Sequence, residues 1–300
     1  FSDWSSDVCS SDLQDAVFGL NKFSDRTKEE IGRMRLSKEA ILRKAGTKSS
    51  SKHLLPVPDV DVPSKYSACG QKYGFGDPSS VDLCDDWIFD QGTCGCCYVV
   101  ANAYELQLRY ANYTYTHTNN TKHVIPSIQM MMDCVRDPGY CDGGFTNTIL
   151  DSSQYIVLEQ DYAYNTTLKP NQKCQKGKKT SIMASYTLFD HAEHIEIIKK
   201  ILHYYGSFVS CVYVDEDKWA YYHDKIYKGK CRKGVMTNHV VEVVGYGVEG
   251  GDEYIIIKNS WGSSWGIHGY MKISADSLCG IGGNDGGYYP VSLIQHVKRL

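Results

Sequence analysis

Residue types suited to nucleophilic catalysis stand at the ends of predicted elements in this sequence. Cys97 closes the string Gln91-Gly-Thr-Cys-Gly-Cys-Cys and begins a predicted helix. A thiol there lies at the positive end of the helix dipole beside free backbone N–H groups, which favours its thiolate. His239 opens one predicted strand and Asn259 follows the next. A nucleophile, a base and a group that orients the base are what this type of catalysis needs.

The elements that must position these residues can be read from periodicity. Residues 97–110 carry apolar side chains at 99, 100, 103, 106 and 108 without an internal Gly or Pro, which predicts a buried helix. Runs of β-branched and aromatic residues begin at His239, Glu253 and Gly269, separated by glycine-rich turns, and predict an antiparallel sheet. Because the predicted helix lies early in the chain and the predicted strands lie late, the sequence favours an α+β fold with two halves over alternating βαβ units.

Length and composition exclude several classes of protein. The chain has 300 residues, of which 42% are hydrophobic and 22% charged, so it has enough apolar side chains for two structural units with a sizeable core. The net charge of -3 provides no positive field for nucleic acid. The longest apolar runs are far shorter than the roughly 18 to 20 residues of a spanning helix, so we expect no membrane span.

Cysteines and glycosylation sequons indicate an oxidising compartment. The chain has 12 cysteines, and Asn112, Asn119 and Asn165 each begin an Asn-X-Thr sequon. Together they predict a glycosylated protein of the secretory pathway, lysosomal or extracellular. Because the sequence begins at Phe1 rather than Met and shows no signal peptide, we expect it to be a fragment.

The amino-terminal region divides into three parts. Residues 1–13 are left unassigned and could be a non-native leader. Residues 14–45 include a charged stretch predicted to be a solvated helix, too polar for the core. Residues 46–63, rich in Ser, Pro, Asp and Val, are predicted to be an extended linker.

Several motifs in order resemble those of the papain-like cysteine peptidases of the papain and cathepsin L type. Cys94-Gly-Cys-Cys-Tyr98 matches the family signature C-G-[SA]-C-[WY] except at Cys96, and His239 falls within its usual spacing of about 130 to 150 residues. Five further motifs occur in the family order: Ser127-Ile-Gln-Met-Met-Met-Asp-Cys134, Cys141-Asp-Gly-Gly144, Val244-Gly-Tyr-Gly247, Asn259-Ser-Trp-Gly-Ser-Ser-Trp-Gly266 and Tyr289-Pro290. The resemblance implies a two-domain fold, with a helical left domain, an antiparallel β-barrel-like right domain and the active-site cleft between them.

The resemblance also implies roles for the catalytic residues. Cys97 is the nucleophile, held as a thiolate against the imidazolium of His239. Asn259 accepts from the far ring N–H of His239, and Trp261 shields that hydrogen bond from water. Gln91 and the backbone N–H of Cys97 form the oxyanion hole. No metal or organic cofactor is implied.

Gly19-Leu-Asn-Lys-Phe-Ser-Asp25 resembles the G-x-N-x-F-x-D motif of the family's inhibitory propeptide. The implied organisation is the carboxyl-terminal part of a propeptide and a linker over residues 14–60, followed by a peptidase domain over residues 61–300. The family's disulfide pairing would join Cys94 to Cys141, Cys134 to Cys174 and Cys231 to Cys279. Cys69 and Cys84 could pair with each other.

The substrate-binding wall implied by the resemblance consists of Gly143, Gly144, Phe145, Thr146, Val212, Thr237, Asn238 and Gly286. Its apolar character predicts a hydrophobic residue two positions before the scissile bond, unless Asn284 or Asp285 reaches the pocket. The sequence has no His-rich insertion of the kind that caps the cleft in carboxydipeptidase relatives, which favours an endopeptidase. The implied partners are protein or peptide substrates, the chain's own propeptide and cystatin-type inhibitors, and we expect a monomer.

Two alternatives remain open at this stage. Cys96 and Tyr98 depart from the common pattern, which is compatible with a catalytically silent homologue that acts as a binding or inhibitory protein. Cys94, Cys96 and Cys97 with His239 could suggest zinc, but the C-x-C-C spacing would crowd thiolates that structural zinc sites separate by two to four residues.

Overall fold

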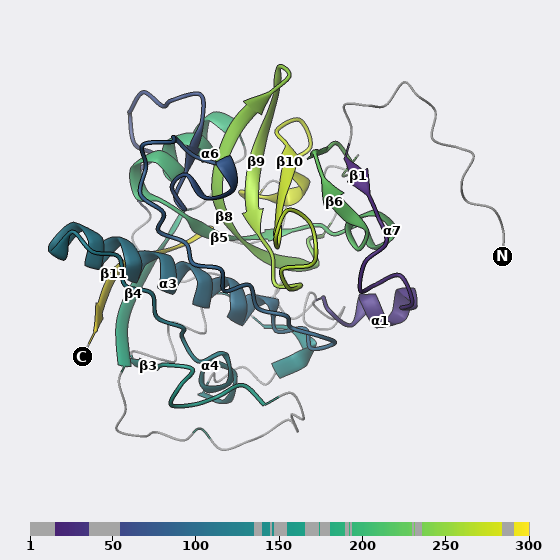
Figure 1. The fold of residues 1–300 in the computed structure, drawn as a ribbon, viewed down its shortest axis with the longest axis horizontal. Helices are drawn as coiled ribbons and strands as arrows, with labels where there is room; N and C mark the ends of the chain where they lie inside the picture. Colours follow the sequence, from purple (N-terminus) through teal and green to yellow (C-terminus); the bar gives the residue numbers. More distant parts are fainter. Residues whose placement is uncertain are drawn as a thin grey trace.

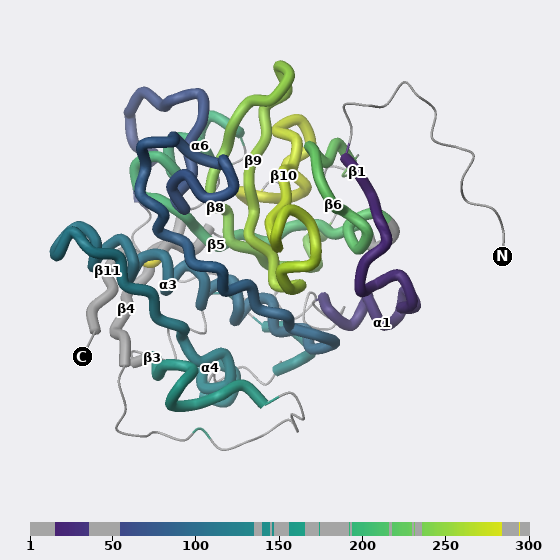
Figure 2. Tube along the Cα trace, viewed as in Figure 1, coloured from purple at the N-terminus to yellow at the C-terminus, as the bar shows by residue number. Residues whose placement is uncertain are grey.

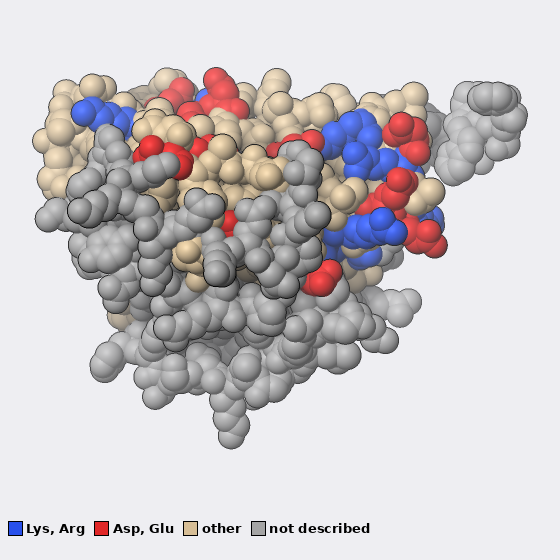
Figure 3. All heavy atoms as spheres, turned by 90° about the horizontal axis from the view of Figure 1, so that it is seen from below, with Lys and Arg blue, Asp and Glu red and all other residues tan. Residues whose placement is uncertain are grey.

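The computed structural model describes residues 16–35, 55–134, 140–144, 146, 155–165, 174, 181–189, 192, 194–229, 231, 236–283 and 291–299. No helix in these ranges combines the length and apolar character needed to cross a membrane. On the face drawn in Figure 3, the coloured basic and acidic side chains lie among one another, in keeping with the small net charge.

The long helix α3, Cys97–Thr118, is the central element (Figure 1). Its first turns are buried on every side because it lies between the sheet and helix α4, and it ends at Asn119, whose φ of 52° stops the helix. The helix begins at the predicted residue and runs eight residues past the predicted span. The other helices are α1 Lys28–Gly32, α4 Ile128–Cys134, α6 Ile195–Tyr205 and α7 Glu216–Trp219, with 3₁₀ turns η1 Lys72–Gly74, η2 Tyr140–Asp142 and η3 Leu278–Gly280.

One large sheet has the strand order β3-β4-β11-β5-β8-β9-β10-β7, and β2 also pairs with β8. Its pairs are antiparallel except β10 with β7. The strands are β2 Tyr66–Ser67, β3 Tyr155–Val157, β4 Ser181–Phe189, β5 Phe208–Val212, β7 Ile226–Tyr227, β8 His239–Glu249, β9 Asp252–Lys258, β10 Tyr270–Ser274 and β11 Val291–Arg299. The mixed α+β architecture is confirmed, but the described strands form an open path rather than a closed barrel.

Two large apolar clusters lie on either side of the residues that the sequence analysis predicts to be catalytic. One joins α3 and α4 to Ile156 and Val240, and the other packs α6, Trp219 and Trp265 against the strands of the sheet. Residues at the start of α3 therefore belong to the first cluster, while Trp261 belongs to the second. The residues singled out for catalysis come from both sides of this division.

The amino-terminal segment packs against the body of the protein. Strand β1, Val17–Phe18, pairs with β6, Tyr222–Asp224, so the purple start of the described chain runs along green β6 (Figure 2). Helix α1 begins with a capping box, in which the Thr27 hydroxyl and the Glu30 carboxylate bind each other's backbone N–H. Ile31 and Met34 are 2% and 0% exposed, so the prediction that this stretch is too polar for the core is wrong. Ile31 on α1 and Met34 just after it both pack into the large apolar cluster of the sheet. Residues 36–54 lie outside the described ranges.

Candidate active site

Cys97 stands at the first position of α3 and is fully buried. The loop before it is fixed by the disulfide between Cys94 and Cys141, and by a 2.7 Å hydrogen bond from Gly95 N to Cys141 O. Cys96 is the N-cap, and its carbonyl accepts from the N–H groups of Val99 and Val100. The Cys97 thiol therefore lies on a rigid turn at the positive end of a 22-residue helix.

The β8–β9 hairpin brings His239 and Asn259 together. His239 opens β8, Asn259 directly follows β9, and the register pairs Glu242 with Lys258. The distance from His239 Nε2 to Asn259 Oδ1 is 2.8 Å, and Oδ1 also accepts from Ser260 N at 2.8 Å. Because this oxygen is the acceptor, Nε2 carries the proton and Nδ1 is the basic nitrogen of the neutral ring. Nδ1 makes no hydrogen bond to the described residues.

The surroundings of His239 oppose its protonated form. Burial lowers the pKa of His239 to about 4, Asn259 acts in the opposite direction, and the positive charge of Arg35 lowers the pKa further. The Trp261 ring lies 5.4 Å from the imidazole, centroid to centroid, and is fully buried. Arg35 belongs to the amino-terminal segment, so that segment changes the charge balance of the site.

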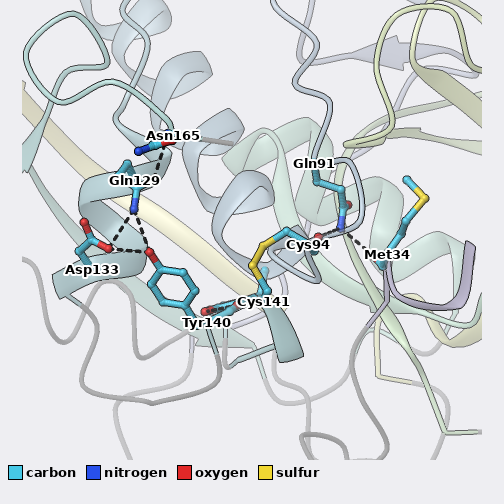
Figure 4. Close-up of a disulfide and its surroundings, with 9 residues drawn as sticks. Met34, Gln91, Cys94, Gln129, Asp133, Tyr140, Cys141 and Asn165 are labelled. Atoms are coloured by element: carbon cyan, nitrogen blue, oxygen red, sulfur yellow. Dashed lines mark hydrogen bonds between the residues drawn. A yellow bond between two sulfur atoms is a disulfide. The ribbon is translucent and has the colours of Figure 1, made fainter. Parts of the chain in front are cut away.

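Gln91 is 2% exposed and points its amide nitrogen at two carbonyl oxygens, Met34 O at 2.7 Å and Cys94 O at 2.6 Å (Figure 4). Its amide oxygen accepts from the Ser260 hydroxyl, and its backbone N–H donates to Ser260 O. Ser260 thus links Gln91 to the residue that holds His239. The Met34 carbonyl thus accepts from the amide group of Gln91 that the family resemblance assigns to an oxyanion.

Further contacts hold the amino-terminal segment over the site. Phe23 is fully buried edge-on to Trp261, with ring centroids 5.5 Å apart. Asn21 donates from its side chain to Ala220 O at 2.8 Å, and Lys22 forms a 2.5 Å ion pair with Asp90. Neither Met34 nor Arg35 was singled out from the sequence, because a backbone carbonyl that fills a distant donor leaves no pattern in residue types.

The predicted substrate-binding residues are distributed around the same region. Gly143 and Gly144 are buried, and a β-carbon at Gly144 would collide with the Tyr98 ring. Val212 pairs directly with His239 across β5 and β8, and Thr237 is buried. The Asn238 side chain is committed to the backbone of Val214, accepting at 2.8 Å and donating at 3.2 Å. The Thr146 carbonyl accepts from Asn102. Phe145, Asn284, Asp285 and Gly286 lie outside the described residues.

Four disulfides lie in the described part of the chain. Three join the pairs implied by the resemblance: Cys94 with Cys141, Cys134 with Cys174, and Cys231 with Cys279. The fourth joins Cys69 and Cys84. Since the Cys94 sulfur is bonded to Cys141, it is not available as a zinc ligand beside Cys96 and Cys97.

Cys96 differs from Cys97 in its environment. Its thiol is fully buried and hydrogen-bonds with Tyr164, and burial raises the pKa of Cys96 well above its ordinary value, with Cys97 a lesser contributor. A thiol of this kind is a poor nucleophile because its thiolate is scarcely populated.

The three sequon asparagines lie at two helices, α3 and α4, and all three are exposed. Asn112 is on an exposed side of α3, and Asn119 is the exposed residue that ends it. Asn165 is also exposed, and its backbone N–H donates to Gln129 Oε1 of α4 (Figure 4).

Comparison with known proteins identifies related chains. Residues 78–287 match the model of the papain family cysteine proteases. The chain is 28% identical over 290 residues to falcipain-3 of Plasmodium falciparum, covering 88% of this chain and 54% of that protein. It is 28% identical over 273 residues to a cathepsin L-like proteinase of Phaedon cochleariae, covering 87% and 75%.

Two solved precursors share the fold. A digestive procathepsin L 3 from the larval midgut of Tenebrio molitor superposes with a TM-score of 0.70 at 19% identity, over 94% of this chain and 83% of the other. Recombinant stem bromelain precursor gives 0.69 at 21% identity, over 94% and 84%. The chain spans only 54% and 58% of the first two curated relatives, the second being a cathepsin L-like proteinase of Fasciola hepatica.

Proposed function

The chain belongs to the papain family of cysteine proteases, and from that premise we propose that it is the zymogen of a cysteine endopeptidase with Gln91, Cys97, His239 and Asn259 as its catalytic residues. The observation that carries the proposal is the hydrogen bond from Gln91 Nε2 to Met34 O. The Met34 carbonyl accepts the hydrogen bond that Gln91 would otherwise donate to the scissile carbonyl oxygen of a substrate.

The reaction follows from the chemistry of these groups. The Cys97 thiolate attacks the scissile carbonyl carbon, a carbon–sulfur bond forms, and the carbonyl electron pair moves to oxygen. The Gln91 side chain and the Cys97 backbone N–H stabilise that oxyanion. As the carbon–nitrogen bond breaks, His239 Nδ1 gives its proton to the leaving amine. Water, deprotonated by His239, then attacks the thioester carbon, the carbon–sulfur bond breaks, and the acid product leaves behind the Cys97 thiolate and the His239 imidazolium.

Asn259 serves this cycle by fixing the ring of His239. Its Oδ1 holds the Nε2 proton at 2.8 Å, so Nδ1 is the nitrogen that exchanges protons with Cys97 and with substrate. The buried Trp261 ring excludes water from that hydrogen bond.

The amino-terminal segment acts as the inhibitory propeptide in this proposal. It places the Met34 carbonyl on Gln91, packs Phe23 on Trp261 and brings the charge of Arg35 to His239. Residues 14–60 are the propeptide and linker, and residues 61–300 form the peptidase domain. Removal of the segment frees the Gln91 donor for substrate.

The specificity and setting of the enzyme complete the proposal. Buried Val212 and the glycines Gly143 and Gly144 favour a hydrophobic residue two positions before the scissile bond. Four disulfides, together with sequons at Asn112, Asn119 and Asn165, fit a glycoprotein that is lysosomal or extracellular. A monomer open to cystatin-type inhibitors is the form we expect.

Labelling of the acid-processed protein with an epoxide or fluoromethyl ketone peptide probe tests the proposal. We expect one adduct at Cys97, its loss in Cys97→Ala, and cleavage of a fluorogenic peptide with a hydrophobic residue at the second position before the bond. A folded, propeptide-free protein with neither adduct nor turnover would instead be a silent homologue that binds without catalysis.

A further inference from the structure

A fully buried tyrosine lies beneath the proposed catalytic residues and touches none of the reacting atoms. Tyr104 is two turns after Cys97 on α3 and is 1% exposed. Its hydroxyl accepts from Phe89 N at 2.7 Å and donates to Asn259 O at 3.2 Å. One side chain on the nucleophile's helix therefore connects the segment that leads to Gln91 with the residue that orients His239.

The Tyr104 ring is also fixed. The ammonium of buried Lys258 lies 4.0 Å from the ring centroid, and Trp87 packs edge-on at 5.2 Å. The charged groups that act on the hydroxyl are Glu242, Asp85 and Asp90. Burial holds the pKa of Tyr104 well above its ordinary value, so the hydroxyl stays protonated and can donate throughout the working range of pH.

Tyr104 holds Phe89 N–H and the Asn259 carbonyl, and a small displacement of either group would move a proposed catalytic residue. The Asn259 side-chain oxygen is committed to His239 and Ser260, so the position of the residue is set by its backbone. The Asn259 backbone N–H donates to Gly269 O, and the Asn259 carbonyl accepts from the Tyr104 hydroxyl. Phe89 precedes Gln91 by two residues, and its carbonyl accepts from Gly262 N.

We propose that Tyr104 is a positioning residue that aligns Asn259 and the Gln91 segment with the Cys97 helix through its two backbone hydrogen bonds. The inference rests on the proposed peptidase function. Loss of the hydroxyl would leave Phe89 N–H and the Asn259 carbonyl without this shared partner inside the protein, and both segments would shift relative to α3. Displacement of catalytic groups by about 1 Å can cost about a hundredfold in rate.

Tyr104→Phe in the mature enzyme is the test, because it keeps the ring, the Lys258 contact and the Trp87 packing. Tyr222→Phe is the matched control. Tyr222 is also fully buried, accepts from a backbone N–H, Lys272 N at 3.3 Å, and donates to a carbonyl, Lys225 O at 2.5 Å. Both variants lose the same kind of bonds, but only Tyr104 is bonded to the proposed catalytic segments.

We expect Tyr104→Phe to lower kcat about tenfold to a hundredfold per titrated active site with little change in KM. The alkaline limb of the pH profile for Cys97 alkylation should move to lower pH, since His239 is held less firmly as imidazolium. Tyr222→Phe should keep the parent's kcat and pH profile. Titration of active sites counts only competent molecules, so a lower yield of folded protein does not imitate the effect.

A kcat per titrated site and a pH profile equal to the parent's in Tyr104→Phe would overturn the inference while the peptidase stands. An equal loss of kcat in both variants would also overturn it, because the effect would then be general loss of packing order. A parent enzyme without Cys97-dependent turnover would overturn the proposed function and this inference with it.

Discussion

Glu105 makes the stability of this protein depend on pH in a direction opposite to that of most carboxyls. The side chain is on α3 and is fully buried. Its Oε1 accepts from Ile294 N at 2.7 Å and lies 3.6 Å from Arg109 Nη2. Burial raises the pKa of Glu105 to about 8, although Arg109 and the Ile294 bond act in the opposite direction.

The consequence for folding follows from proton linkage. In the unfolded chain Glu105 ionises near pH 4.5, whereas the folded protein keeps the proton until about pH 8. Between these values the unfolded state binds fewer protons, so the free energy of unfolding falls as pH rises. The two pKa values correspond to a loss of up to about 5 kcal/mol from Glu105 alone across this window. Below pH 4.5 both states bind the proton, so Glu105 adds no further pH dependence and its destabilising effect is absent.

Glu105→Gln isolates this effect because an amide keeps an oxygen for Ile294 N and does not ionise. In a Cys97→Ala background, which prevents autolysis, urea unfolding at intervals from pH 4.5 to 8 should give similar stability at pH 4.5. At pH 8 the Gln variant should be the more stable, by several kcal/mol. Asp276→Asn, at an exposed position, is the control. If the free energy of unfolding depended on pH in the same way in the parent and in Glu105→Gln, the reasoning would be refuted.

Three further predictions concern the proposed catalytic site. Gln91→Ala should lower kcat about 10²- to 10³-fold in the mature enzyme with little change in KM, because one oxyanion donor is lost; unchanged single-turnover acylation would contradict this role. Cys96→Ser should retain turnover and the stoichiometric label at Cys97, because the Cys96 thiol is buried with a raised pKa; loss of the label in this variant would identify the wrong nucleophile. A synthetic peptide of residues 16–35 should inhibit the mature enzyme less strongly as pH falls from 6.5 towards 4, measured as its inhibition constant; affinity independent of pH in this window would show that His239 is not linked to binding.

The elements that carry the site were predictable where the sequence pattern is local. The unbroken apolar run after Cys97 predicts the start of α3, since no Gly or Pro interrupts it. The β-branched runs at His239 and Glu253 predict the hairpin that joins His239 to Asn259. The pairing of three disulfides came from the family resemblance, because sequence spacing does not determine connectivity, and only the Cys69–Cys84 pair was suggested apart from it.

Features that depend on distant partners were not predictable. The apolar face of α1 is only Ile31 with Met34 beyond its end, and its burial depends on a surface built mainly from the second half of the sequence. Tyr104 appears in the sequence as one more residue of a buried helix. The partners of its hydroxyl are backbone groups 15 and 155 residues away, whose positions are set by how the whole fold closes.

The amino-terminal segment acts on the proposed site in two ways that oppose each other at low pH. Its Met34 carbonyl satisfies Gln91, which favours binding at any pH. The same segment brings the charge of Arg35 to buried His239, and in this state the pKa of His239 is about 4 rather than the ordinary 6.5. Between these values His239 therefore holds fewer protons in the bound precursor than in an open site with the ordinary pKa, so the His239 contribution favours release in acid, by up to about 3 kcal/mol. As pH falls over this range, the cost of ionising buried Glu105 also falls, so release of the segment and integrity of the peptidase domain are compatible at one pH.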